Sequence, residues 1–472
     1  MVQVARHPAP DRLTTGGDIG MTYYDYTLLN ALVCLAPPIL YLLGKIKDPF
    51  HPLLFAGGAA FGAVCYIPLT NPDPAFRYTT ANALSNFELL TMVSMLSLYW
   101  GWAWWAKRRP MGLTQQGSLL AVYRDQYDPQ RMILVAWVYA MVSALIAVRT
   151  YGHFSYSGYL TALVFLEWPA AILFIQAAIL DRNLLGMAII GLPIAMTESL
   201  LRFFLYGSRF ETAVFADLLL LPFLATGRRP RKTIFLVVLA GFAVVMWSMT
   251  TSRQVIGRGE ATNRFSALGV AIEEVFSHPH SRYTAGKTFV FGANVTKVAM
   301  MTHFGDGSFI YNLGVHFLPK EWFPNKNSYY TDWGQTNDVA MVRRYLGMSV
   351  GTMPNGAACT GFASVFTQFG WLFPFPWFLL GIFLRHIYAG AVYLRRFNYL
   401  AYLVLTNMLV FLLIGQDIYQ FCLYGFFGFV PATLAFWYCR TRQFRAASVA
   451  QPVAVAGIPR RSATPTRPGG PP

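Results

Sequence analysis

The chain has 472 residues, of which 55% are hydrophobic and only 12% are charged, with 37 Lys and Arg against 21 Asp and Glu. Soluble globular domains carry about 25% charged residues, so this composition excludes an ordinary soluble protein. The net charge of +16 is divided into short clusters between apolar runs. That pattern is typical of membrane topology signals and contact with anionic lipid, and it argues against nucleic acid as a partner.

The apolar runs predict an all-α, polytopic integral membrane protein with about 11 transmembrane helices. A bilayer core requires about 20 mostly apolar residues per helix, and eleven segments approach this length. The last two, joined at Gln416 and Asp417, could instead form a re-entrant pair. In chain order the predicted spans cover residues 24–44, 50–69, 87–106, 132–150, 159–180, 184–206, 211–226, 233–249, 367–384, 399–416 and 418–438.

Lys and Arg in the connections predict the orientation. One set of connections, including the C-terminal tail, holds 21 basic residues, whereas the short connections on the opposite side hold only Arg77, Arg149 and Arg209. Because basic residues stay on the cytoplasmic side, the N-terminus is expected outside and the C-terminus inside. An odd number of spans, such as eleven, likewise places the two termini on opposite sides of the membrane. We therefore expect a multi-pass protein of a bacterial inner (plasma) membrane.

The segments outside the spans divide the chain further. Residues 1–23 form a polar leader, 24–249 hold the first eight helices, and 250–366 form a large periplasmic loop. The last three helices lie within 367–439, and the basic tail 440–472 is expected to be disordered in the cytoplasm. Loops as long as 250–366 are uncommon unless they have a function. Helix-like apolar spacing within this loop predicts a helical cap.

Ionisable residues inside the predicted spans are the first functional signal, because a charge in lipid is costly and by default lines a cavity or pairs with another. With the orientation above, all of them lie in the outer half of a span or at its outer end. Glu198 and Arg202, one helical turn apart, could simply form a structural pair. The one-sided distribution favours a site that opens outward. These residues are Glu88, Arg149, Glu167, Glu198, Arg202, Asp217 and Asp417.

A Gly-Ser-Arg turn, Gly207–Arg209, joins the sixth and seventh spans at the outer surface. An arginine there offers a planar set of donors that suits a lipid phosphate. The alternative is an interfacial arginine whose side chain only reaches toward lipid headgroups. His278 and His280 lack further ligands at zinc spacing, so no metal site is predicted.

The Gly-Ser-Arg turn, the basic segment Gly227–Lys232, the loop stretch Phe317–Lys326 and the entry to the ninth span, Gly361–Trp371, together resemble the O-antigen and exopolysaccharide repeat-unit polymerases (Wzy type), relatives of the O-antigen ligases. The resemblance covers roughly residues 200–375. Where that family has Glu, Tyr and Asn in the last stretch, this chain has Ser364, Phe366 and Gln368.

The resemblance implies polymerisation of polyprenyl-pyrophosphate-linked oligosaccharides on the outer leaflet, by a metal-independent glycosyl transfer that releases lipid pyrophosphate. It implies no cofactor, and a chain-length regulator and a flippase as further partners. Arg209 is expected to contact the pyrophosphate, with Arg202 second. The general base is left open among His303, Asp306, His316, Glu321, Asp332 and Asp338, of which His316 and Asp306 are preferred. Further expected phosphate or sugar contacts are Arg253, Arg258, Lys320, Lys326, Arg343 and Arg344.

Three alternatives remain open at this point. An O-antigen ligase would use the same chemistry with a different acceptor. A transporter or flippase for lipid-linked glycans would be expected to place polar groups on both sides of the membrane midplane and to show internal symmetry. A non-catalytic scaffold in a polysaccharide assembly complex is a third alternative.

Overall fold

The computed structural model describes residues 22–48, 51–70, 81–108, 127–150, 163–206, 360–389 and 418–440, with separate residues at 231 and 237, between 266 and 322, and between 406 and 413. All secondary-structure elements in this part of the chain are helices. One isolated antiparallel bridge pairs Tyr127 with Arg440. The all-α prediction is thus confirmed for the described residues.

The described helices follow the predicted apolar runs. A capping box starts the first one, since Thr22 accepts a hydrogen bond from the backbone of Asp25 and the Asp25 carboxylate accepts one in return. The bounds are α1 (Tyr23–Leu42), α2 (Pro52–Ala60), the π-helix η1 (Phe61–Cys65), α3 (Tyr66–Thr70), α5 (Ala81–Arg108), α7 (Pro129–Thr150), η2 (Leu163–Leu166), α9 (Glu167–Leu180), η3 (Arg182–Leu184), α10 (Leu185–Ala195), α11 (Thr197–Tyr206), α19 (Gly361–Phe369), η4 (Gly370–Leu372), α20 (Pro374–Tyr388) and α22 (Ile418–Cys439).

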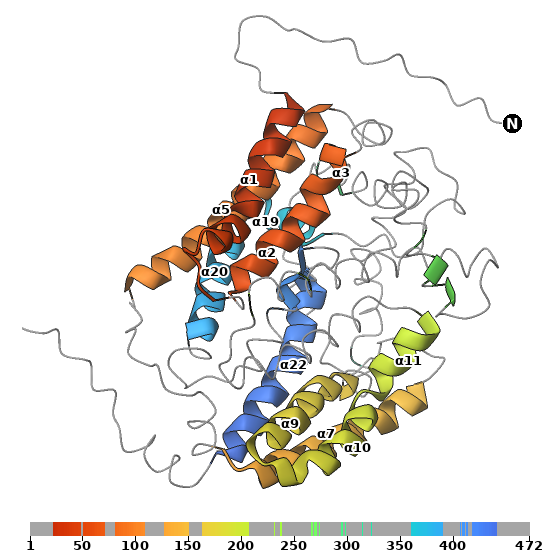
Figure 1. The fold of residues 1–472 in the computed structure, drawn as a ribbon. Helices are drawn as coiled ribbons and strands as arrows, with labels where there is room; N and C mark the ends of the chain where they lie inside the picture. The colour runs from red at the N-terminus through yellow and green to blue at the C-terminus, as the bar shows by residue number, and fades with distance from the viewer. Residues whose placement is uncertain are drawn as a thin grey trace, which may run out of the picture.

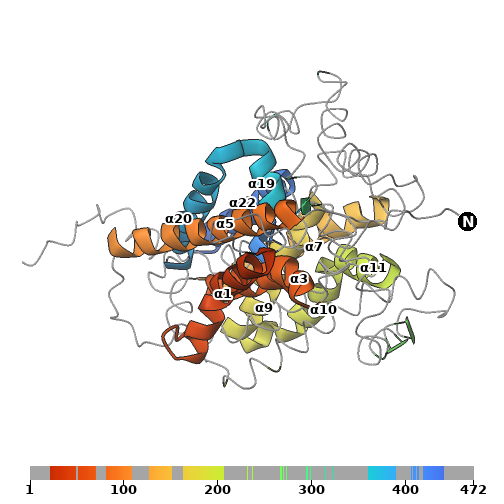
Figure 2. The same ribbon diagram turned by 90° about the horizontal axis from the view of Figure 1, so that it is seen from above.

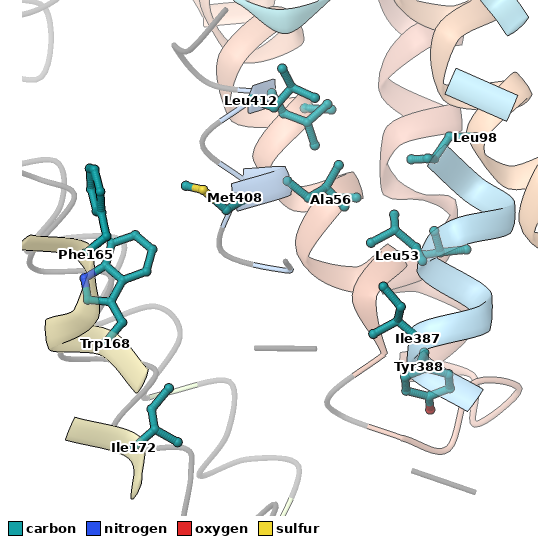
Figure 3. Packing of buried hydrophobic residues seen from close by; sticks show 14 of the residues in the cluster. Leu53, Ala56, Leu98, Phe165, Trp168, Ile172, Ile387, Tyr388, Met408 and Leu412 are labelled. Carbon is teal, nitrogen blue, oxygen red and sulfur yellow. The ribbon is translucent and has the colours of Figure 1, made fainter. Parts of the chain in front are cut away.

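The helices form two groups that share one hydrophobic core. Figures 1 and 2 show α1, α2, α5 and α20 in one group and α7, α9 and α10 in the other, with α22 reaching from α19 to α7. In Figure 3, Leu53 of α2 lies beside Ile387 of α20, and both belong to the same buried cluster as Trp168 of α9. Burial of these side chains holds the described part of the chain together.

A close helix contact joins α5 and α20 at two glycines. A Cβ atom added at Gly101 would overlap the backbone carbonyl oxygen of Phe378, and one added at Gly381 would overlap that of Leu98. Small residues at a helix crossing let two backbones approach, which is a common way for helices to associate in membranes. The absence of a side chain at both positions therefore sets the distance between α5 and α20.

The C-terminal ends of α5 and α20 meet the connection between α1 and α2. The ring of His51 lies 4.7 Å from that of Trp102 and 5.4 Å from that of Tyr388. The Arg385 guanidinium carbon lies 4.9 Å above the Trp102 ring, and the Tyr388 hydroxyl donates a hydrogen bond to Asp48. We call these five residues the aromatic cluster. It brings three segments of the chain to one end of the group.

His51 of the aromatic cluster gives a pH prediction. The structure begins α2 at Pro52, so His51 lies in the connection before that helix. Burial, and then the positive charge of Arg385, lower the pKa of His51 from 6.5 to about 3. As pH falls below 6.5 the unfolded chain protonates this histidine while the folded chain does not, so stability falls by about 1.4 kcal/mol per pH unit until pH approaches 3.

The measurement is the melting temperature of the purified protein in neutral detergent between pH 7.5 and pH 5. The wild type is expected to lose more stability on acidification than His51→Gln, which cannot bind this proton. His386→Gln is the matched control, because it replaces an exposed histidine at the end of α20 and leaves His51 in place. Equal slopes for the wild type and His51→Gln would contradict the prediction.

In the second group, α9 packs against both α7 and α10, which also pack against each other. Gly191 of α10 lies against the ring of Phe174, where an added Cβ would overlap ring atoms. The Ser143 hydroxyl donates to the carbonyl oxygen of Val164 at 2.8 Å, and the Tyr139 hydroxyl donates to that of Pro431 in α22 at 3.2 Å. These bonds tie the start of the α9 segment and the middle of α22 to α7.

Three described helices are long and apolar enough to cross a membrane, and a fourth span results if α19 and α20 are counted as one broken span. The three are Tyr23–Leu42, Pro129–Arg149 and Leu163–Leu180. Leu134, Val138, Leu145 and Val148 form an exposed apolar stripe along one face of α7. Such a stripe is unfavourable in water and is suited to lipid, so the chain is a membrane-associated helical protein.

Two predicted spans are broken in the structure. The predicted span 184–206 divides at Met196, whose backbone (φ −94°, ψ 21°) leaves the helical region after Pro193 in α10. The predicted span 367–384 is also not straight, because α19 and α20 meet at an angle of 114°. Gly370 ends α19 with φ 55°, a conformation that favours glycine. Apolar length alone did not reveal either break.

The predicted seventh span, nearly all of the eighth, most of the tenth, most of the large loop and nearly all of the leader and tail lie outside the described residues. The count of about 11 spans and the helical cap therefore stay predictions. Single described residues of the loop do join the core, since Val295 and Val298 belong to the buried cluster.

Candidate functional site

A buried carboxylate joins α9 to α11. Glu167, which is 3% exposed, accepts hydrogen bonds from the Ser199 hydroxyl (2.6 Å), the Ser199 backbone N–H (3.0 Å) and the Trp168 indole N–H (3.0 Å). Both carboxylate oxygens therefore have donors. A carboxylate held in this way orients its neighbours, so we assign Glu167 a positioning role.

The break at Met196 creates this contact. The first N–H groups of a helix have no partner within that helix, and Ser199 lies in the first turn of α11. Glu167 accepts from this N–H group and so caps α11 from a different helix. A negative charge at a helix N-terminus is also favoured by the helix dipole. The broken span is thus held by the acid that the sequence placed in the preceding one.

Glu198 lies beside this contact on the same helix turn. It is 4% exposed, so α11 buries two consecutive polar residues, Glu198 and Ser199, at its start. Arg202 follows Glu198 by one turn of the same helix, as predicted, but its side chain lies outside the described residues. The predicted pair of Glu198 with Arg202 therefore stays a prediction. Glu198 is thus a buried member of the predicted intramembrane set.

Two of the predicted site residues, Glu167 and Glu198, lie on α9 and α11, the helices that the contact of Glu167 with Ser199 joins. Most of the other predicted residues lie outside the described residues, and their placement stays a prediction. These are the catalytic candidates Arg209, His316 and Asp306, the phosphate or sugar contacts Arg253, Arg258, Lys320, Lys326, Arg343 and Arg344, and the intramembrane Asp217.

A second buried polar contact lies between α1 and α5. The Asn30 amide donates to one oxygen of Glu88 at 2.5 Å, and both side chains are fully buried. The other Glu88 oxygen has no hydrogen-bond partner among the described residues. The Cys34 thiol donates to the Asn30 carbonyl oxygen at 3.5 Å. Glu88 was recognised from the sequence as an intramembrane acid, but its partner Asn30 was not.

The missed partner has a physical explanation. Asn30 is one amide within an apolar run, 58 residues before Glu88, and no local spacing connects the two. A polar side chain in a transmembrane run is nevertheless a signal, because it must find a partner inside the protein. Such a search would have marked Asn30, but only the packing of α1 against α5 identifies Glu88 as that partner.

The last of the four stretches that resemble the family, Gly361–Trp371, begins with the buried helix α19. In α19, Ser364 and Phe366 are 5% and 7% exposed, so both face the core. At the start of α19, the Thr360 backbone N–H and hydroxyl donate to the Asn294 side-chain oxygen at 2.7 and 3.2 Å. Asn294 belongs to the large loop, so this contact anchors the loop to the helix that follows it.

No family model, curated protein or solved structure matches the chain. Within the described part of the chain, no three or more His, Cys, Asp or Glu side chains are grouped so as to hold a metal ion. The assignment of a function therefore rests on the residues themselves.

Proposed function

We propose that this protein is a membrane glycosyltransferase that polymerises polyprenyl-pyrophosphate-linked oligosaccharide repeats. The observation that supports it best is the contact of Glu167 with Ser199, which fixes the start of α11 beside the buried Glu198. From Ser199 the helix continues to Tyr206, about 10 Å farther at 1.5 Å per residue. It therefore leads directly to the Gly207–Arg209 turn.

The proposed orientation puts this turn at the outer surface of a bacterial inner membrane, with the N-terminus outside and the C-terminus inside. The aromatic cluster supports it. Under this topology α1, α5 and α20 all run inward, so the ends of α5 and α20 should meet the connection that follows α1. His51 and Asp48 of that connection contact Trp102 and Tyr388 at those ends. Several basic connections proposed to be cytoplasmic thus share one end.

The proposed reaction is an inverting or retaining displacement at an anomeric carbon. The terminal hydroxyl of the acceptor glycan forms a new C–O bond, the bond to the pyrophosphate oxygen breaks, and the hydroxyl proton passes to a general base. Arg209, with Arg202 and loop basic residues, would stabilise the negative charge that grows on the departing lipid pyrophosphate. His316 and Asp306 are the proposed candidates for the base. Glu167 would keep α11 in place.

The experiment uses a deletion strain complemented with variants of the full chain. Arg209→Ala should reduce polymer formation by about 100-fold or more, which is the usual effect of removing one donor to a developing negative charge. Arg182→Ala is the control, because Arg182 is exposed in the short η3 connection. Membrane abundance of both variants is measured alongside, so that loss of polymer is not confused with loss of protein.

The strain also separates the rival functions. Single repeats that accumulate on the lipid carrier outside the membrane support a polymerase, whereas finished polymer on the carrier supports an O-antigen ligase. Repeats trapped on the cytoplasmic side support a transporter or flippase. Normal polymer in the Arg209→Ala strain would remove Arg209 from the site.

A further inference from the structure

Basic residues gather at the aromatic cluster, of which Arg385 is a member. Lys45 and Lys47 are exposed in the connection after α1, and Arg385 and His386 lie in the last turn of α20. The chain separates these two pairs by more than 300 residues. The contacts of Asp48 and His51 with Tyr388 bring them to the same end of the helix group. Asp48, the acid in this connection, already accepts a hydrogen bond from Tyr388.

The surroundings match the headgroup level of a membrane. Leu43, two residues before Lys45, is 68% exposed, and Trp100 of α5, whose ring contacts Phe378 of α20, is 67% exposed. Trp105 contacts His386 with ring centroids 5.9 Å apart. Aromatic rings with one apolar and one polar edge concentrate at the boundary between acyl chains and headgroups, and basic residues there attract anionic lipid. Here the exposed apolar side chains would face the acyl chains and the cations would face the headgroups.

The site is also held in shape. Arg385 stacks on Trp102, and His51 packs against both Trp102 and Tyr388, so the end of α20 cannot move independently of the α1–α2 connection. An arginine whose plane is fixed by a ring loses little freedom on binding a phosphate. Lys45 and Lys47 add charge without fixed geometry. This combination provides one oriented cation and two adaptable ones.

We propose that Lys45, Lys47 and Arg385 bind the phosphate of an anionic phospholipid, and that the bound lipid links the α1–α2 connection to the end of α20. The occupant is a lipid because the cations lie next to exposed apolar surface that acyl chains would cover. The inference rests on the membrane character of the helices and is independent of the proposed glycosyl transfer.

The test measures the melting temperature of the purified full-length protein in phosphatidylcholine vesicles with and without phosphatidylglycerol. A ligand that binds only the folded state raises the melting temperature, so the wild type should melt higher in the anionic vesicles. Lys45→Gln/Lys47→Gln should lose most of that rise. The control is Arg182→Gln/Arg231→Gln, which removes the same charge from two exposed positions outside the proposed site and should keep the rise of the wild type.

A third condition separates the two sources of phosphate. Inorganic phosphate added to phosphatidylcholine vesicles should leave the melting temperature unchanged. An equal rise with inorganic phosphate would overturn the lipid as occupant. An equal loss in both double variants would show a general effect of surface charge, and an unchanged rise in Lys45→Gln/Lys47→Gln would show that these lysines do not bind; either outcome overturns the proposal.

Discussion

Gly381→Ala is expected to destabilise the protein by about 3 kcal/mol, although it adds a single methyl group. The added Cβ would overlap the carbonyl oxygen of Leu98 and lie 2.9 Å from the backbone nitrogen of Trp102. Both obstacles are backbone atoms of α5, which cannot rotate away as a side chain can. The two helices must therefore separate, and the contacts around Gly101 and the aromatic cluster would be lost with them.

The measurement is thermal unfolding of the detergent-solubilised protein. The quantity recorded is the fraction of protein that remains monodisperse after heating to each temperature. Gly186→Ala is the matched control, because Gly186 also lies inside a helix but has nothing within 4 Å of an added Cβ. Alanine favours the helix over glycine by about 1 kcal/mol, so this control should be neutral or slightly more stable. Equal stability of both variants would refute the close approach of α5 to α20.

Glu167→Ala is expected to cost about 3 kcal/mol, since it removes the acceptor of three buried donors. Two of them belong to Ser199 and one to Trp168. Loss of the backbone contact should matter most, because it caps the first turn of α11. We expect the stretch from Met196 toward Tyr206 to exchange its amide hydrogens faster in this variant, while α7 and the α5–α20 contact keep the protection of the wild type.

Two comparisons test this account of Glu167. Ser199→Ala removes the hydroxyl but keeps the backbone N–H, so it should cost about 1 kcal/mol. Glu273→Ala removes an acid at an exposed position and should leave stability unchanged. A loss as small for Glu167→Ala as for Glu273→Ala, measured by thermal unfolding, would show that Glu167 does not hold α11.

The sequence determined the class of structure and where helices occur, because both depend on local properties. The apolar runs 24–44, 132–150 and 159–180 predicted spans, and the structure has the helices Tyr23–Leu42, Pro129–Arg149 and Leu163–Leu180 there, each long and apolar enough to cross a membrane. Such runs could not reveal the breaks at Met196 and Gly370. A broken helix pair has the same composition as a straight span. The length of an apolar run therefore does not show whether the helix axis changes direction within it.

The partners of the buried polar residues were decided only by the tertiary structure. Glu88 and Glu167 were recognised as intramembrane acids from the sequence. Their partners Asn30 and Ser199, which are 58 and 32 residues away in the chain, meet them only through helix packing. Tyr388 and Asp48 are 340 residues apart. Helix order and orientation in a bundle arise from all of its contacts together. The sequence could therefore place these polar groups along their helices, whereas only the fold could say which of them meet.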